Sequence, residues 1–243
     1  MRRLVLVRHG ESIWNSEARI QGQACAGLSD VGHLQAEALG PVLAAAHPDA
    51  RLVVSDLQRC RETIAPLAAA LGREPEVDPA LRERSFGAWE GLLRSEVAET
   101  DAERWERFRS GEDVISEVGG ESSEQLADRV EPVLRALIET TEPDGVTVAV
   151  THGGPVWQGT HRLLALTPPM LGGVDNTSVT EFLRLDDGRI LLDRWNEVGH
   201  LGTHLRTKMG RRATGASPRT PPAKQRLVRP QPQPDQHAGA QRE

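Results

Sequence analysis

Residues 4–12 read LVLVRHGES, so four consecutive apolar residues lead directly into an arginine, a histidine and a glycine. A short apolar run that stops at such a turn signal is typical of a buried strand ending in a loop. Ligands of open α/β sheets bind beyond the carboxyl ends of the strands. Arg8 and His9 are therefore the first candidates for a functional site.

Two later segments repeat this arrangement. Residues 52–54 (LVV) lead toward Arg59, and residues 146–150 (VTVAV) lead into Thr151 and His152. If all three runs are strands of one parallel sheet, their carboxyl ends meet at the same edge. Two histidines and two arginines are then expected to converge there from three places in the chain.

Helical patterns alternate with these strands. The first expected helix carries Leu34, Ala38 and Val42 at helical spacing. The expected elements are helices at 30–46, at 58–71 and after the capping-box pair Ser122 and Gln125, and a β-hairpin formed by 179–185 and 190–195. This alternation predicts a three-layer α/β/α sandwich with a mostly parallel mixed sheet.

Charge and proline content divide the chain into two parts. Residues 206–243 carry a net charge of +7 and six of the 16 prolines, whereas residues 1–205 carry −13. We expect a folded domain at 1–205 and a disordered basic tail at 206–243, because the tail has almost nothing to bury. The tail has no aromatic residue that could stack on bases, so no nucleic-acid partner is expected.

The overall composition excludes several classes of protein. No apolar run approaches the length of a membrane span, and the N-terminus lacks a secretory pattern, so we expect a cytoplasmic protein without a membrane partner. The lysines are Lys208 and Lys224 alone, which excludes a P-loop kinase and a pyridoxal-phosphate enzyme. Cys25 and Cys60 lack a CxxC spacing, and we expect both to be reduced and without a catalytic role.

The residues expected at the sheet edge suit a phosphoryl group. Arginine forks pair with phosphate oxygens, and a neutral imidazole can attack phosphorus. Neighbouring arginines disfavour the imidazolium and keep such a nucleophile unprotonated. No Asp/Glu cluster with metal-ligand spacing accompanies these residues, so neither a metal nor another cofactor is expected.

A general acid must still protonate the leaving oxygen. The segment 81–91 (LRERSFGAWEG) offers Glu83 and Glu90. From the residues alone, either one is more often a solvated loop carboxylate.

The ordered set of motifs resembles the histidine phosphatase superfamily, in the branch that includes cofactor-dependent phosphoglycerate mutases. The similarity is collinear over about 200 residues, the whole expected domain. The matching stretches are LVRHGES at 6–12 with Trp14, Asn15, Gln21 and Gly22; SDLQR at 55–59 with Thr63; Glu83 with Gly87 and WEG at 89–91; GGES at 119–122; and VTHGG at 150–154.

The resemblance implies a role for each matching residue. His9 would be the phosphohistidine nucleophile, and Glu83 the acid that later activates water. Arg8, Arg59 and His152 would bind the phosphoryl group. On the substrate side, the implied residues are Asn15, Gln21, Gly22 and Gly153.

Departures from the family pattern favour hydrolysis over mutase chemistry. Mutases carry His-Gly-Asn where this chain has His152, Gly153 and Gly154, and they have a longer insertion after the acid. A phosphoglycerate mutase, distinguished by an isomerised product instead of free phosphate, remains the second hypothesis. A non-catalytic module that binds a phosphorylated ligand is the third, and retention of the full residue set argues against it.

The expected substrate is a small phosphomonoester, such as a sugar phosphate or a phosphoglycerate derivative. Residues 171–178 (LGGVDNTS) and 192–196 (LDRWN) resemble the end of glucosyl-3-phosphoglycerate phosphatases. Arg19, Arg84 and Arg94 could bind a substrate carboxylate, although solvated surface positions are the commoner role of such arginines. Residues His200 and His204 lack a third ligand for a metal. Relatives are often dimers, so the resemblance also implies a homodimer.

Overall fold

The computed structural model describes residues 1–24, 27–167 and 170–207. The strands are β1 (Arg2–Arg8), β2 (Arg51–Val54), β3 (Glu76–Val77), β4 (Val146–Thr151), β5 (Val179–Arg184) and β6 (Ile190–Glu197). The helices are α1 (Ile13–Ser16), α2 (Asp30–Ala46), α3 (Gln58–Leu71), α4 (Arg94–Thr100), α5 (Ala102–Arg109), α6 (Ser123–Thr140) and α7 (Gly153–Leu163). Short 3₁₀ turns occur at Pro79–Leu81, Gly87–Trp89, Ile115–Val118 and Thr203–Leu205.

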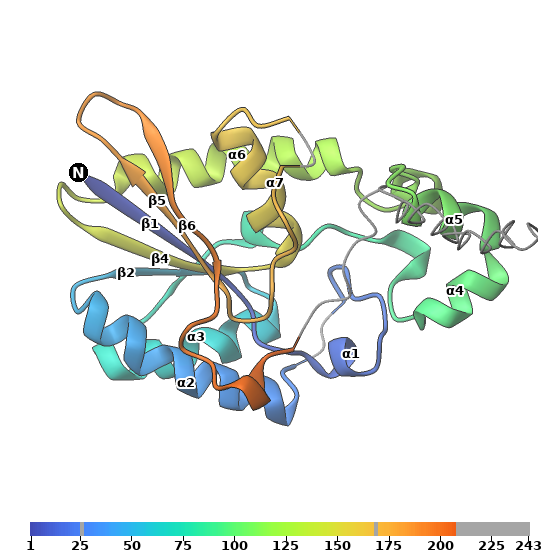
Figure 1. Cartoon of the computed structure of the whole chain (residues 1–243), viewed down its shortest axis with the longest axis horizontal. Helices are drawn as coiled ribbons and strands as arrows, with labels where there is room; N and C mark the ends of the chain where they lie inside the picture. Colours follow the sequence, from blue (N-terminus) through green and yellow to red (C-terminus); the bar gives the residue numbers. More distant parts are fainter. Residues whose placement is uncertain (25–26, 168–169, 208–243) are drawn as a thin grey trace, which may run out of the picture.

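The sheet has the strand order β3-β2-β4-β1-β5-β6. Strands β3, β2, β4 and β1 are parallel, and the hairpin of β5 and β6 adds two antiparallel pairings at one side. Figure 1 shows α2 and α3 on one face of this sheet and α6 and α7 on the other. The expected mixed sheet between two helical layers is confirmed.

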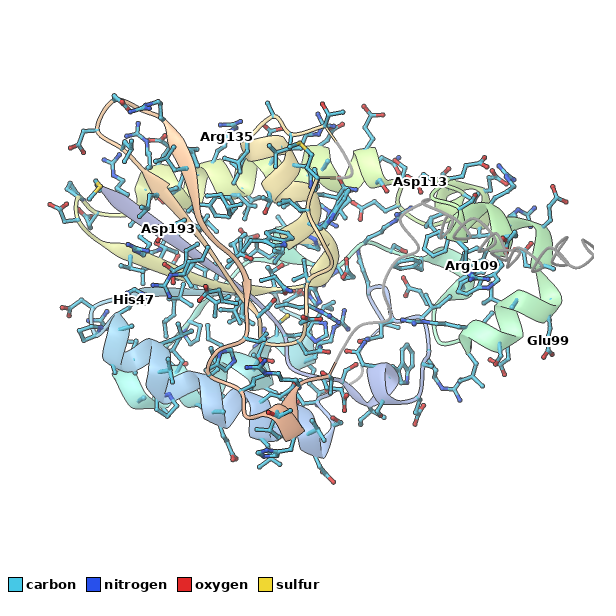
Figure 2. The ribbon with its side chains drawn as sticks, in the orientation of Figure 1. His47, Glu99, Arg109, Asp113, Arg135 and Asp193 are labelled. Atoms are coloured by element: carbon cyan, nitrogen blue, oxygen red, sulfur yellow. The ribbon has the colours of Figure 1, made fainter. Side chains whose placement is uncertain are left out.

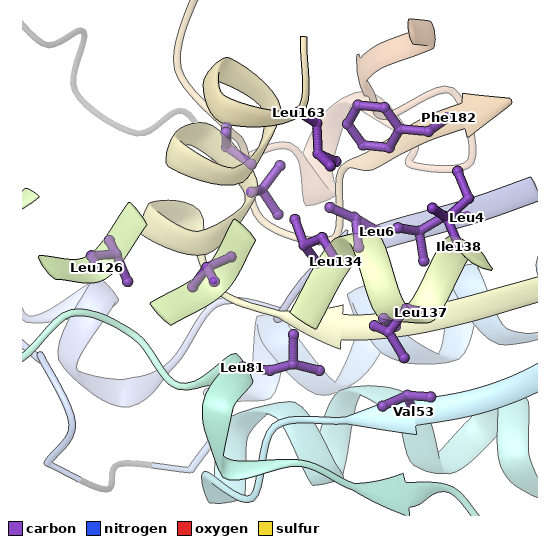
Figure 3. Packing of buried hydrophobic residues seen from close by; sticks show 14 residues of the cluster. Leu4, Leu6, Val53, Leu81, Leu126, Leu134, Leu137, Ile138, Leu163 and Phe182 are labelled. Atoms are coloured by element: carbon purple, nitrogen blue, oxygen red, sulfur yellow. The ribbon is translucent and has the colours of Figure 1, made fainter. Parts of the chain in front are cut away.

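The alternation of β1 side chains divides the core between the two layers. Leu4 and Leu6 face α6 and α7, in a cluster that includes Leu134 and Phe182 (Figure 3). The intervening Val5 and its neighbours on β2 and β4 pack against α2 and α3. Because both faces of β1 are covered, its apolar run is continuous, as in other buried parallel strands.

Local signals account for the ends of two helices. Helix α6 begins with the predicted capping box, in which Ser122 accepts from the Gln125 N–H and the Gln125 side chain accepts from the Ser122 N–H. Helix α3 ends at Gly72, which has a φ of +62° in the left-handed region that favours glycine. Both boundaries agree with the sequence prediction.

Helix α2 forms where it was predicted, but the apolar residues that marked it do not form its buried face. Leu34 and Val42 are 50% and 51% exposed, whereas the buried positions include Gln35, Leu39 and Leu43. Two small glycines and a glutamine on the buried side make room for close contacts that an apolar-residue count overlooks. The two-residue β3 was also not predicted.

The packed part of the chain extends to Thr207. Arg206 donates to the Leu201 carbonyl and Thr207 bonds with Gln35 and Asn176, although both residues belong to the expected tail. The rest of that tail, 208–243, lies outside the described residues, as does Cys25. Among the helices that are described, none has the length and apolar character needed to cross a membrane.

Leu134→Ala should lower the free energy of unfolding by about 2–5 kcal/mol, because Leu134 is fully buried between the sheet and α7. Leu34→Ala, which makes the same chemical change at an exposed site on α2, should change it by less than about 0.5 kcal/mol. Urea titrations of the two variants and the unsubstituted protein measure both values. A larger loss in Leu34→Ala would contradict the observed orientation of α2.

Candidate active site

Three strand ends meet at one edge of the sheet. Arg8 pairs with Thr151 at the ends of β1 and β4, and Val54 of β2 pairs with Val150 of β4. The next residues of each strand therefore lie together. The rings of His9 and His152 have centroids 5.1 Å apart. The structure thus brings together side chains that are separated by more than 140 residues in the sequence.

The His9 ring has a defined tautomer. Its Nδ1 lies 2.6 Å from the Gly10 carbonyl oxygen, which can only accept a hydrogen bond. Nδ1 therefore carries the hydrogen and Nε2 keeps its lone pair. Burial holds the pKa of the imidazole well below its ordinary value, with further contributions from the charges of Arg59 and Arg8. The ring is neutral, and its Nε2 has a lone pair that is available for attack on an electrophile.

Gly10 allows close packing directly behind His9. A Cβ at this position would lie 2.8 Å from the Gly32 carbonyl oxygen on α2, so only glycine fits. The Gly10 N–H donates to Thr63 Oγ1 at 2.9 Å, and Thr63 in turn donates to the Arg59 carbonyl. Thr63 therefore connects α3 to Gly10, the residue that follows His9.

Arg59 is completely buried and links three parts of the site. Its Nε donates to His152 Nδ1 at 3.2 Å. Its two terminal nitrogens donate to the carbonyls of Gly22 and Ala24 at 2.8 and 3.0 Å. The guanidinium thus positions both the second histidine and the loop at 22–24.

The tautomer of His152 follows from its partner. Because Nδ1 accepts from Arg59, the hydrogen lies on Nε2, which donates to Ser55 Oγ at 3.0 Å. Burial lowers the pKa of this imidazole well below its ordinary value. Cys60 Sγ lies 3.3 Å from the same Nε2, and burial raises the pKa of its thiol to about 12. Cys60 is therefore a protonated, buried thiol without nucleophilic character.

The guanidinium of Arg8 is only partly engaged in hydrogen bonds. One terminal nitrogen donates to the Val174 carbonyl at 2.7 Å, whereas the buried Nε has no partner among the described residues. Burial lowers the pKa of this guanidinium to about 10. A Cβ at Gly153 would lie 3.5 Å from that Nε, so Nε sits beside the N-terminus of α7. A buried donor next to a helix N-terminus suits an anion.

Glu83 lies against the first turn of α7. Its two carboxylate oxygens accept from the backbone N–H groups of Gly154 and Arg84, at 3.1 and 2.9 Å. A Cβ at Gly154 would lie only 2.1 Å from one of these oxygens. The absence of a side chain at 154 is therefore what admits the carboxylate.

Glu90 has a different environment from Glu83. One oxygen accepts from the backbone of Gln23 and Phe86 and from the Ser85 hydroxyl, and the other accepts from the Ala24 N–H. Four donors occupy this carboxylate and hold the loop at 22–24 against the segment at 85–90. Glu90 therefore has a structural role, whereas Glu83 accepts from only two donors among the described residues.

The side-chain amides of Asn15 and Gln21 both bond to Ser12, three residues after His9. The Asn15 oxygen accepts from the Ser12 N–H and from Asn176, and the Gln21 oxygen accepts from the Ser12 hydroxyl. No described residue accepts a hydrogen bond from either amide nitrogen. Both amides can therefore still donate to a ligand.

The three arginines suggested for a substrate carboxylate differ in their surroundings. Arg84 is buried and pairs with Asp113, labelled in Figure 2, so assigning it to the substrate or to the solvated surface was wrong. Arg19 donates to Glu17 and to the Gly91 carbonyl. Arg94 is exposed, and its side chain has no ion pair or hydrogen bond with any described residue.

No metal centre is formed by the part of the chain that is described. Within it, no three His, Cys, Asp or Glu side chains are grouped so that they could hold an ion. His200 Nε2 instead lies 3.2 Å from Thr177 Oγ1. Burial lowers the pKa of this imidazole to about 4.

Sequence reasoning missed several polar residues that support the site. They are Gln35, Ser55, Thr63 and Asn176, all at most 3% exposed. Ser55 and Thr63 belong to motifs that match the family, but no role was predicted for them. Asn176 belongs to the C-terminal segment 171–178. Gln35 gave no signal, because a single glutamine in a helical pattern usually faces solvent.

His9→Asn should weaken the pH dependence of stability. The buried His9 stays neutral when folded but binds a proton below about pH 6.5 when unfolded, so acid favours unfolding. Between about pH 7.0 and 5.5, the unsubstituted protein should lose about 1 kcal/mol more unfolding free energy than His9→Asn does. His33→Asn, at an exposed position, is the matched control. Equal pH dependence in all three proteins, measured by urea denaturation, would contradict a neutral buried His9.

Comparison with known proteins identifies relatives over nearly the whole described chain. Residues 4–198 match the model of the histidine phosphatase superfamily, branch 1. A metal-independent phosphoserine phosphatase of Arabidopsis thaliana is 35% identical, covering 82% of this chain and 83% of that protein. A glucosyl-3-phosphoglycerate phosphatase of Mycobacterium tuberculosis is 36% identical, covering 84% and 98%.

The fold agrees with these matches. The solved structure of a mycobacterial glucosyl-3-phosphoglycerate phosphatase with VO₃ superimposes with a TM-score of 0.70 at 34% identity, covering 81% of this chain and 99% of that one. The expected family, fold and enzyme class, a phosphoric monoester hydrolase of the histidine phosphatase type, are confirmed. The chain belongs to branch 1 of the histidine phosphatase superfamily.

Proposed function

We propose that this protein hydrolyses small phosphomonoesters without a metal, through a phosphohistidine formed at His9 Nε2. The observation that carries the proposal is the neutral His9 ring, whose Nδ1 is engaged by the Gly10 carbonyl while Nε2 keeps its lone pair. Arg8 and Arg59 surround it with buried positive charge. Such a nucleophile beside cationic groups is suited to attack on a phosphoryl centre.

The first chemical step transfers the phosphoryl group. The Nε2 lone pair of His9 attacks phosphorus, and the bond from phosphorus to the ester oxygen breaks. Protonated Glu83 gives its proton to the departing oxygen, so the product alcohol leaves neutral. Arg8, whose buried Nε lacks a partner among the described residues, donates to the phosphoryl oxygens together with Arg59. His152 donates there as well only when its Nε2 hydrogen leaves Ser55 Oγ.

The second step regenerates the enzyme. The Glu83 carboxylate removes a proton from water while the water oxygen attacks phosphorus. The bond between phosphorus and His9 Nε2 then breaks, its electron pair returns to the ring and inorganic phosphate leaves. The position of Glu83 against the Gly154 N–H holds it beside the same helix terminus in both steps.

The surroundings of Glu83 also support hydrolysis over mutase chemistry. The carboxylate occupies the space that any side chain at position 154 would need. An asparagine there, as in the mutase pattern, would require the carboxylate to shift. The mutase alternative predicts an isomerised product, and the proposed phosphatase predicts stoichiometric inorganic phosphate.

For the substrate, we propose a sugar phosphate or a phosphoglycerate derivative such as glucosyl-3-phosphoglycerate. The similarity to the mycobacterial phosphatases of that substrate supports this choice, and so does the C-terminal motif at 171–178. The free amide donors of Asn15 and Gln21 and the exposed Arg94 could bind hydroxyl and carboxylate groups beyond the phosphoryl group. A phosphate-release screen that includes phosphoserine tests the choice.

His9→Ala should abolish both turnover and labelling of the protein. Brief incubation with ³²P-labelled substrate and rapid quenching should give an acid-labile, base-stable label on the unsubstituted enzyme, as a phosphoramidate requires. The label is located by peptide mapping. Turnover that persists in His9→Ala would rule out the mechanism.

Glu83→Gln should slow hydrolysis of a sugar phosphate by about 10²–10⁴-fold, because an alkoxide is a poor leaving group without a proton. It should slow p-nitrophenyl phosphate hydrolysis much less, because nitrophenolate departs unprotonated. Steady-state rates on both substrates give the ratio. Glu90→Gln, which perturbs the clamp on the loop at 22–24, should affect both substrates alike. A leaving-group dependence that appears in Glu90→Gln and not in Glu83→Gln would reverse the assignment.

A further inference from the structure

The peptide unit between Gly10 and Glu11 determines how the His9 ring is held. Its carbonyl oxygen receives the Nδ1 hydrogen of His9. At the other end of the same peptide, the Glu11 N–H donates to Gln35 Oε1 at 2.8 Å. Gln35 is fully buried on α2. The acceptor for the ring is therefore oriented by this glutamine.

The preceding peptide unit, between His9 and Gly10, is held by a second buried amide. The His9 carbonyl accepts from Asn176 Nδ2 at 3.1 Å and from the Thr177 N–H at 3.3 Å. Asn176 is 3% exposed and also donates to the Asn15 oxygen. The two peptides that follow β1 thus depend on one glutamine and one asparagine.

Both of these amides meet at the hydroxyl of Thr207. Gln35 Nε2 lies 3.1 Å from Thr207 Oγ1, and Thr207 Oγ1 lies 3.1 Å from Asn176 Oδ1. Gln35 Nε2 also donates to the Leu205 carbonyl at 2.7 Å. The C-terminal segment that carries Thr207 lies beyond the residues matched to the family, which end at 198.

The direction of each hydrogen bond follows from the backbone. The Glu11 N–H can only donate, so Gln35 presents its oxygen there and its nitrogen to Thr207. The hydroxyl accepts that bond, and its single hydrogen goes to the Asn176 oxygen. Asn176 is then oriented with its nitrogen toward the His9 carbonyl. Each hydrogen bond in this series thus fixes the orientation of the next group.

We propose that Thr207 is a positioning residue for the nucleophile. Its hydroxyl accepts from Gln35 and orients the amide of Asn176, and it thereby joins the two side chains that hold the peptides on either side of Gly10 and keep His9 Nδ1 on the Gly10 carbonyl and Nε2 free. The catalytic part of this inference rests on the proposed function of His9. The tautomer of the ring does not, and it can be observed without turnover.

The test compares Thr207→Val, which keeps the shape and removes the hydroxyl, with Thr207→Ser, which restores it. Thr203→Val is the matched control, because Thr203 is exposed in the same segment and its side chain bonds to no described residue. Two readouts are used on the full-length protein. One is steady-state hydrolysis of p-nitrophenyl phosphate, and the other is the ¹⁵N spectrum of histidine-labelled protein, with His9 assigned by its absence in His9→Asn.

Thr207→Val should lower kcat by about three- to tenfold, the effect of one lost orienting hydrogen bond, with KM within about twofold. Its His9 signals should change from a single tautomer hydrogenated at Nδ1 to a mixture, while Thr207→Ser and Thr203→Val retain the original kcat and spectrum. Unchanged His9 signals in Thr207→Val, or an equal loss in Thr207→Ser, would overturn the proposal. An unsubstituted protein that hydrolyses no phosphate ester would refute the proposed function, and the spectra would still decide the role of Thr207.

Discussion

Parallel pairing of β1 with β4 brings the two histidines together, because β1 ends directly before His9 and β4 ends directly before His152. The register aligns Arg8 with Thr151, and the His9 N–H continues the ladder by donating to the Thr151 carbonyl. Helices cover both faces of this pair. They keep water away from the strands and specify a single pairing register. Helices α3 and α7 then start at the same edge and supply Arg59 and the backbone N–H of Gly154.

The site concentrates positive charge in a region from which water is excluded. Arg8 and Arg59 are almost fully buried, and Arg8 forms no ion pair with a carboxylate of the described residues. Burial of a guanidinium without a counterion costs free energy. The dianionic phosphoryl group of the proposed substrate would supply that counterion. Burial, and then the charges of these arginines, hold the pKa of both histidines well below the ordinary value.

Local sequence signals were sufficient to predict much of the fold, and they placed the candidate residues His9, Arg59 and His152 after the strands whose ends the structure brings together. A capping box and a terminal glycine defined helix ends, and apolar runs followed by Arg, His or Gly defined the strands that lead to the site. The errors came from tertiary contacts. Nothing local shows that Arg84 is buried against Asp113, or that the polar Gln35 faces inward while Leu34 faces out. Those orientations depend on partners 24 or more residues away in the chain.

The contact between Glu83 and Gly154 has a consequence for how such a protein can change through evolution. A side chain gained at 154 would meet the Glu83 carboxylate at 2.1 Å, so the carboxylate would have to turn away from its present place against α7. A substitution at 83 alone leaves that space open. The effect of a substitution at 154 therefore depends on which residue stands at 83, and the two positions are coupled.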